Sequence, residues 1–189
     1  MGSFNPIHNG HVEAIEAALT HGKCKKVIVV PTMQNPWKEV QPLPIEERMY
    51  MIWLATKQFG GMVEVSLIES GMQPPYYSCN TLDTIRGEYP NDELAIIIGA
   101  DTFNSIHLWH DFNERIQPHF SLVVLERKGV ELNPSEKTSQ MPFSYIMSCA
   151  GQDISSTQIR ELVRNGAKTI PNLPKNVAEY IFKKGFYTK

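Results

Sequence analysis

Two histidines near the N-terminus, His8 and His11, lie three residues apart in the stretch GSFNPIHNGH. The small residues Gly2, Ser3 and Gly10 around them would let the backbone approach a ligand closely. The pattern that follows predicts a helix, whose N-terminus offers unpaired N–H groups and the positive end of a dipole, and both favour an anion. Each imidazole can donate a hydrogen bond to that anion through one ring nitrogen. The stretch therefore predicts an anion site, although a helix cap with two solvated histidines would show the same spacing.

A second candidate anion site lies near the C-terminus, in the stretch SSTQIR. Ser155, Ser156 and Thr157 stand at the start of a helical pattern, where hydroxyl groups cap free N–H groups. Arg160 follows one turn later on nearly the same face. Hydroxyls, a helix N-terminus and a guanidinium fork suit a triphosphate. A plain N-cap with an exposed arginine would look the same in the sequence.

The bulk composition limits the classes of partner. The chain has 189 residues and a formal net charge of −2, so no strong field favours nucleic acid or an anionic membrane. Its three cysteines are odd in number and widely spaced, which is typical of a protein of the reducing cytoplasm. The N-terminus shows no signal peptide, and apolar runs such as VIVV and AIII are far too short to span a bilayer. We therefore expect a cytoplasmic protein of one domain, 1–189, without nucleic-acid or membrane partners, and we leave a homo-oligomer open.

Strand patterns and helix patterns alternate along the chain, which predicts an α/β fold with a mostly parallel sheet. Apolar, β-branched runs predict strands within 25–32, 63–70, 94–101, 120–128 and 143–148. Amphipathic patterns predict helices within 11–22, 45–59, 78–89, 155–166 and 173–185, with 102–116 helical or broken-helical. Asn9 and Ser78 are the expected N-caps of the first and third helices. The polar segment 129–142 predicts a loop.

Polar side chains follow several of the predicted strands. The N-terminal turn, Lys38, Asp101 and Arg127 all stand at such positions. In parallel sheets ligands bind beyond the carboxyl ends of the strands, so one crevice could hold them all. Any α/β protein also places polar loops there, so this clustering alone does not establish a site.

Several motifs, in their order, resemble a known family. GSFNPIHNGH is similar to the HxGH signature of the nucleotidyltransferase superfamily, and the later motifs resemble one branch of it, bacterial nicotinate mononucleotide adenylyltransferase. These later motifs cover most of the chain: VVPTMQNPWK, PYYSCNTL, IIGADTFNSIHLW, ISSTQIR and LPKNVAEYIFKKGFY.

The resemblance implies a Rossmann-like nucleotidyltransferase fold with helices on both faces of the sheet and the SSTQIR and closing helices at 155–185. It implies transfer of AMP from ATP to nicotinate mononucleotide, with Mg²⁺ carried by ATP and no metal site of the protein's own. The catalytic residues would be His8, His11, Lys38 and Arg160. ATP would contact Gly2, Ser3, Phe4, Gly10, Asp101, Ser155, Ser156 and Thr157, and the mononucleotide would contact Ser78, Asn80, Trp109, His110 and Arg127.

Some positions depart from the family pattern. Met1 stands where the family has the first of two glycines, His110 where an aromatic residue is common, and Ser78 and Cys79 where hydroxyl residues are common. The departures at His110 and in the pair Ser78 and Cys79 leave nicotinamide mononucleotide, or another phosphate acceptor, as an alternative substrate. Trp109 could also be a core tryptophan.

Two other classes of function remain as alternatives. The pairs His8 and His11, and His107 and His110, could together bind zinc, although both pairs are spaced i, i+3 where helical zinc sites more usually use i, i+4. A nucleotide sensor that has kept the pocket and lost turnover would carry the same residues.

The family also has a short apolar strand before the glycine turn, in the middle of the sheet, and the chain from Met1 contains none. We expect Met1 to be an internal methionine of a longer natural chain. The alternative is that the protein tolerates the gap through another chain or a rearranged N-terminus. In either case residues 1–4 should form a loop beside a gap or weak pairing between the strands around Val29 and Ile97.

Overall fold

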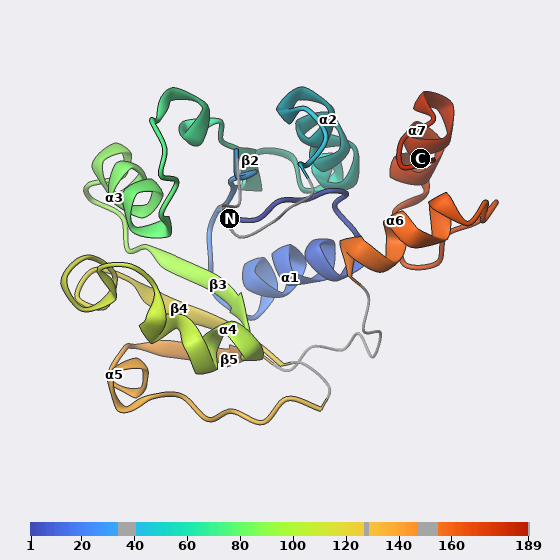
Figure 1. Ribbon diagram of the computed structural model, residues 1–189. Helices are drawn as coiled ribbons and strands as arrows, with labels where there is room; N and C mark the ends of the chain where they lie inside the picture. The colour runs from blue at the N-terminus through green and yellow to red at the C-terminus, as the bar shows by residue number, and fades with distance from the viewer. Residues whose placement is uncertain (34–40, 127–128, 147–154, 189) are drawn as a thin grey trace.

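The computed structural model describes residues 1–33, 41–126, 129–146 and 155–188 (Figure 1). Its strands form two parallel sheets, which confirms the predicted α/β class. The smaller sheet pairs β1 (Val27–Val29) with β2 (Val63–Val65). The larger has the order β3-β4-β5, with β3 (Ala95–Gly99), β4 (Ser121–Leu125) and β5 (Phe143–Ile146).

The helices lie close to their predicted positions. They are α1 (Asn9–Thr20), α2 (Ile45–Thr56), α3 (Ser78–Glu88), α4 (Ala100–Ser105), α5 (Glu136–Ser139), α6 (Ser156–Arg164) and α7 (Lys175–Lys184). Short 3-10 helices cover Lys57–Met62, Ile68–Gly71 and Ile106–Leu108, and a π-helical turn covers Phe112–Ile116. None of the helices in the described part of the chain is both long and apolar enough to cross a membrane.

Three local predictions need correction. The N-cap of α1 is His8 rather than Asn9, because His8 keeps an extended backbone and Asn9 is already helical. In the same way Tyr77, and not Ser78, is the N-cap of α3. The expected loop 129–142 contains α5, whose N-cap Ser135 accepts a hydrogen bond from the Thr138 N–H.

Two hydrophobic cores cover opposite faces of the larger sheet. In β4, Val123 belongs to the first core, whereas Leu122 and Val124 belong to the second. The first core is built from α1, α2, α6, α7 and β1, and includes Ile15, Met51, Ile52, Ile159, Val177 and Ile181. The second core includes Leu82 of α3, Ile96 and Ile98 of β3, Phe103, Ile106, Phe112 and Ile116. Because neighbouring side chains of a strand point to opposite faces, β4 lies between the two cores, with helices on both sides.

The sheet is interrupted beside the N-terminus. Within the described residues, 1–4 pair with the segment that follows β1 only through one isolated bridge between Gly2 and Pro31, and no ladder joins β1 to β3. The Gly2 N–H donates to the Val30 carbonyl at 3.0 Å, and the Thr32 N–H donates to the Gly2 carbonyl at 2.9 Å. Met1 packs against the second core. The expected loop and gap are therefore confirmed.

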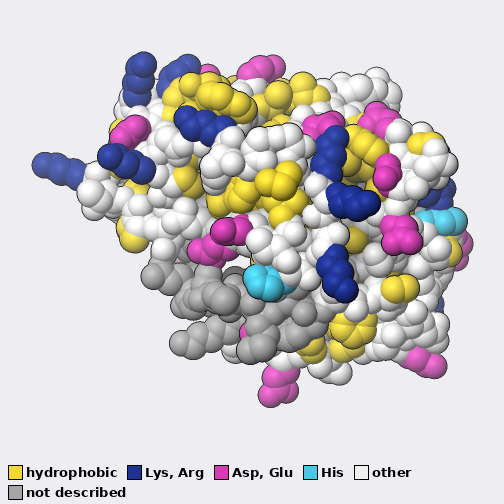
Figure 2. All heavy atoms as spheres, turned by 180° about the vertical axis from the view of Figure 1, so that it is seen from behind, with side chains coloured by type: hydrophobic (Ala, Val, Ile, Leu, Met, Phe, Trp, Pro, Cys, Tyr) yellow, Lys and Arg dark blue, Asp and Glu magenta, His cyan; other side chains and the backbone are white. Residues whose placement is uncertain are grey.

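The charged surface is mixed in sign. The face shown in Figure 2 carries both basic and acidic side chains, and acidic groups lie among and beside the basic ones. This distribution agrees with the net charge of −2 and means that an anionic ligand needs a local site.

Leu122 and Leu108 provide a matched test of the second core, because Leu122 is 1% exposed and Leu108 is 75% exposed. Leu122→Ala should lower the free energy of unfolding by about 2–5 kcal/mol, since it removes buried methyl groups and leaves a cavity. Leu108→Ala should change it by less than about 0.5 kcal/mol. Urea unfolding measures both variants, and equal losses would contradict this assignment of the core.

Candidate active site

The two N-terminal histidines lie against one another at the start of α1. We call residues 2–11 the histidine turn. The His8 N–H donates to His11 Nδ1 at 3.2 Å, and the two ring centroids are 3.7 Å apart. Because His11 Nδ1 accepts this bond, a neutral His11 carries its proton on Nε2, which is then a donor for a ligand. His8 Nδ1 is buried and has no hydrogen-bond partner among the described residues.

Burial keeps both imidazoles neutral. It lowers the pKa of His8 to about 4, and it lowers the pKa of His11 to about 3 with a smaller contribution from the neighbouring His8. An anion at this position would favour the protonated forms and raise both pKa values. Without a ligand, each ring offers one N–H group at neutral pH.

Gly2 and Gly10 lie close to aromatic rings of the histidine turn. A Cβ atom on Gly2 would lie 3.3 Å from the Phe4 ring, and one on Gly10 would lie 3.2 Å from His8 Nδ1. Phe4 has a φ of 44°, is buried, and meets the edge of the His11 ring with centroids 4.9 Å apart. The sequence analysis attributed these small residues to close approach of a ligand. In the structure, the rings of Phe4 and His8 within the turn already leave little room for a Cβ atom at Gly2 and Gly10.

The second candidate anion site lies directly against the first. Ser156 Oγ donates to the Pro6 carbonyl at 2.8 Å, and Arg160 Nη1 donates to the Asn5 carbonyl at 2.9 Å. Arg160 Nη2 also donates to Thr157 Oγ1 at 3.0 Å. The hydroxyl of Ser155, the N-cap of α6, accepts a hydrogen bond from the Gln158 N–H. The structure therefore brings together two motifs that stand about 150 residues apart in the sequence.

The residues expected to bind the mononucleotide gather elsewhere. His110 stacks on Tyr77, with centroids 4.3 Å apart and an interplanar angle of 10°. Ser78 is the first residue of α3, and Asn80 Nδ2 donates to the Pro75 carbonyl at 3.3 Å. Trp109 packs against the second core, as the alternative of a core tryptophan predicts, and is partly exposed. Figure 1 shows α3 and α6 on opposite sides of α1, so one ligand that contacts both must be extended.

Asp101 lies in the first turn of α4 and is exposed. Its backbone carbonyl accepts a hydrogen bond from Ser105 Oγ at 3.1 Å. Lys38 and Arg127, the two other predicted basic residues, lie outside the described residues.

The four-histidine zinc site does not form. Among the described residues, the group of side chains close enough to share a metal ion is Cys79, His110 and Asp111, which includes neither His8 nor His11. Arg115 already donates to this group, with Nη1 3.3 Å from Cys79 Sγ and 3.2 Å from Asp111 Oδ2. A guanidinium thus stands beside the thiol and the carboxylate that a metal ion would need.

Sequence reasoning missed the residues that support the turn. Arg48 is 1% exposed and donates to three backbone carbonyls, those of Ser3, Thr32 and Leu43, at 2.8–2.9 Å. Glu69 is also buried, and it accepts hydrogen bonds from the Met33 N–H and from Thr81 Oγ1, both at 2.9 Å. Their position in amphipathic or polar stretches gave no signal of burial.

Comparisons with known proteins agree with the sequence motifs. The cytidylyltransferase-like family matches residues 1–162. The chain is 33% identical to a probable nicotinate-nucleotide adenylyltransferase of Endomicrobium trichonymphae, over 98% of this chain and 95% of that protein. It is 31% identical to a probable nicotinate-nucleotide adenylyltransferase of Flavobacterium johnsoniae, over 100% of this chain and 96% of that protein.

A solved structure shares the fold. The nicotinic acid mononucleotide adenylyltransferase of Plasmodium falciparum, complexed with NaAD, superposes with a TM-score of 0.78 at 18% sequence identity. The match covers 99% of this chain and 95% of that one.

The lowered pKa values of His8 and His11 predict a pH-dependent stability. Between about pH 4 and pH 6.5 the unfolded chain binds protons on these imidazoles that the folded chain does not bind. The free energy of unfolding should therefore fall as the pH falls through this window. Urea unfolding at about pH 7 and about pH 5 measures the effect.

His11→Gln removes one of the two groups and should weaken this pH dependence. His21→Gln, which removes an exposed imidazole at the other end of α1, is the control. An equal pH dependence in the wild type and in His11→Gln would refute the assignment.

Proposed function

Because the chain belongs to the cytidylyltransferase-like family and, within it, to the nicotinate-nucleotide adenylyltransferases, we propose that it transfers AMP from ATP to nicotinate mononucleotide. The products would be nicotinate adenine dinucleotide and pyrophosphate. The observation that supports this proposal most strongly is the contact between the histidine turn and α6. Neutral histidines, a helix N-terminus and Arg160 are held there by direct hydrogen bonds.

The chemistry needs little proton transfer. A phosphate monoester has a second pKa of about 6, so the 5′-phosphate of the acceptor is largely ionised at neutral pH. One of its oxygens would attack the α-phosphorus of ATP, and the bond from that phosphorus to the bridging oxygen would break as pyrophosphate leaves. A strong general base is not required, and the protein's task is to position two anions and stabilise the developing charge.

The side chains at the turn suit that task. His11 would donate from Nε2 to an oxygen on the transferred phosphorus, and His8 would contact the neighbouring phosphates. Arg160 has five N–H donors, and contacts to Asn5 and Thr157 use two of its nitrogens, so further N–H groups can reach phosphate oxygens. Lys38 would neutralise the triphosphate, and Ser155, Ser156 and Thr157 would contribute hydroxyl or backbone donors.

Mg²⁺ would enter with ATP. The described side chains that contact the turn donate hydrogen bonds through hydroxyl, guanidinium and phenol groups, and His11, whose Nδ1 accepts the His8 N–H, can donate through Nε2. This donor set fits phosphate oxygens and does not fit a hard cation, which prefers oxygen ligands. The ion would therefore be held mainly by the phosphates themselves.

The acceptor would bind beside α3. His110 stacks on Tyr77, and its Nδ1 lies 3.0 Å from a carboxylate oxygen of Asp111. A protonated His110 would favour the carboxylate of nicotinate over the amide of nicotinamide. Ser78 and Asn80 at the start of α3 would add donors, and Asp101 would face the adenosine ribose or the phosphates.

His11→Ala should lower kcat by about 10²–10³-fold, because it removes a donor aimed at the charge that develops in the transition state. ATP binding should change much less. Steady-state formation of the dinucleotide from ATP, Mg²⁺ and nicotinate mononucleotide measures this effect. His21→Ala, at the other end of α1, is the control. Near-normal turnover of His11→Ala would exclude the assigned role, and binding without turnover in the wild type would favour the nucleotide sensor.

Nicotinate mononucleotide should have a kcat/KM at least about tenfold above that of nicotinamide mononucleotide, which corresponds to about 1.4 kcal/mol in the transition state. His110→Ala should reduce this ratio. Parallel assays with the two acceptors measure the preference. Equal kcat/KM values, or a higher value for the amide, would show that His110 does not select the acid.

A further inference from the structure

The last described residues of the chain return to the histidine turn. The Tyr187 hydroxyl donates to Asn5 Oδ1 at 2.7 Å, across a separation of 182 residues. Gly185 ends α7 in the left-handed conformation with φ 67°, and Tyr187 also has a positive φ of 63°. This double bend turns Phe186 and Tyr187 back against the first core. Burial raises the pKa of the Tyr187 phenol, so it is a neutral O–H donor.

Asn5 is the point at which four segments meet. Its Oδ1 accepts the Tyr187 hydroxyl and also the Leu43 N–H, at 3.2 Å, from the segment that leads into α2. Its backbone carbonyl accepts Arg160 Nη1 from α6. Asn5 is 6% exposed, so its carbonyl and amide oxygens need these donors inside the protein.

Asn5 lies between Phe4 and His8, the two residues of the turn that contact His11. Phe4, the residue before it, packs against the His11 ring. His8, three residues after it, is the N-cap of α1 and donates to His11 Nδ1. A rotation of the Asn5 backbone would therefore displace both imidazoles.

We propose that Tyr187 is a positioning residue for the transfer reaction. Its hydroxyl fixes the Asn5 amide, and through Asn5 it holds His8 and His11 in the geometry that the reaction needs. This inference rests on the proposed function for its kinetic consequence. The placement of the two histidines can be tested without that function.

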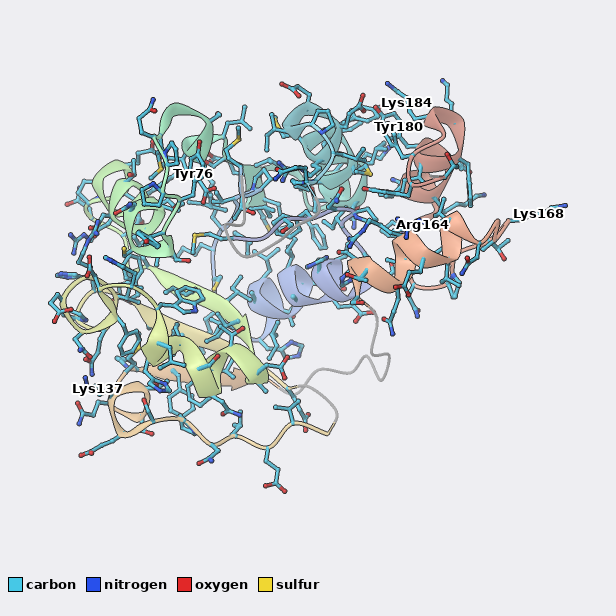
Figure 3. All side chains as sticks on the ribbon, viewed as in Figure 1. Tyr76, Lys137, Arg164, Lys168, Tyr180 and Lys184 are labelled. Carbon is cyan, nitrogen blue, oxygen red and sulfur yellow. The ribbon has the colours of Figure 1, made fainter. Side chains whose placement is uncertain are left out.

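α7 provides a matched control. Tyr180 lies on α7 and its hydroxyl donates to Glu47 of α2, where Lys184 binds the same carboxylate at 3.2 Å. Figure 3 shows Tyr180 and Lys184 on the part of α7 that faces α2. Tyr180→Phe and Tyr187→Phe each remove one hydrogen-bonded phenol oxygen from the C-terminal part of the chain. Of the two residues, Tyr187 contacts the histidine turn.

The kinetic test compares the two variants in the full-length chain. A small misplacement of a group that acts in the transition state can cost about 10²-fold in rate. Tyr187→Phe should therefore lower kcat by about tenfold or more, with a smaller change in the KM for ATP, whereas Tyr180→Phe should leave kcat close to that of the wild type.

In an Asn5→Ala background, Tyr187→Phe should have no further effect, because the acceptor of its hydroxyl is absent. An equal kcat in the two variants, or an undiminished loss in the Asn5→Ala background, would overturn the proposal.

A second measurement is independent of activity. NMR titration of the ligand-free protein reports the pKa of each imidazole. Tyr187→Phe should raise the pKa of His11 from about 3 toward its ordinary value of 6.5, because a displaced ring is less buried. Tyr180→Phe should not alter it. If the wild type made no dinucleotide, the proposed function would fail while this titration still tested the contact. An unchanged His11 pKa in Tyr187→Phe would refute the positioning role.

Discussion

Three backbone carbonyls of the histidine turn take their hydrogen bonds from side chains of distant helices. The Ser3 carbonyl accepts Arg48 Nη1 from α2, while the Asn5 and Pro6 carbonyls accept Arg160 and Ser156 from α6. Buried carbonyls must find donors, and this part of the turn has no strand ladder to supply them. The conformation that places the two imidazoles therefore depends on the packing of α2 and α6 around it. The same contacts bring the two candidate anion motifs together.

Arg48, one of the side chains that hold the histidine turn, is a buried charged group. Removing a guanidinium from water costs free energy unless its donors find partners, and three backbone carbonyls accept hydrogen bonds from Arg48 Nε and Nη1. Glu69 is buried nearby and binds the Met33 N–H, next to the Thr32 carbonyl that Arg48 holds. The chain leaving β1 is thus fixed from both sides at the point where it enters the segment that carries Lys38.

Neutral histidines agree with the chemistry of phosphate transfer. A site that already held two imidazolium groups would need counter-ions before the substrate arrived. Burial lowers the pKa of both rings, so the turn by itself carries no such charge, and a phosphate bound there would raise both pKa values. In the proposed reaction, positive charge would then develop beside the triphosphate of ATP. Arg160, whose charge does not depend on pH in this range, anchors the turn in both states.

Local patterns in the sequence were sufficient for the α/β class, the parallel strands and the boundaries of most helices, because each of these depends on neighbours within a few residues. The sequence analysis placed the N-caps of α1 and α3 one residue late, at Asn9 and Ser78. In the structure the extended backbone of His8 and Tyr77 makes these residues the N-caps, although neither is a residue type that commonly caps a helix. The roles of Arg48 and Tyr187 could not be identified, although Tyr187 is the last residue of the family motif LPKNVAEYIFKKGFY. Arg48 stands in the charged run EER, which looks solvated, and Tyr187 stands near the end of the chain. Their roles arise from hydrogen bonds that span 45 and 182 residues, and only the packing of the helices against the turn brings those donors and acceptors together.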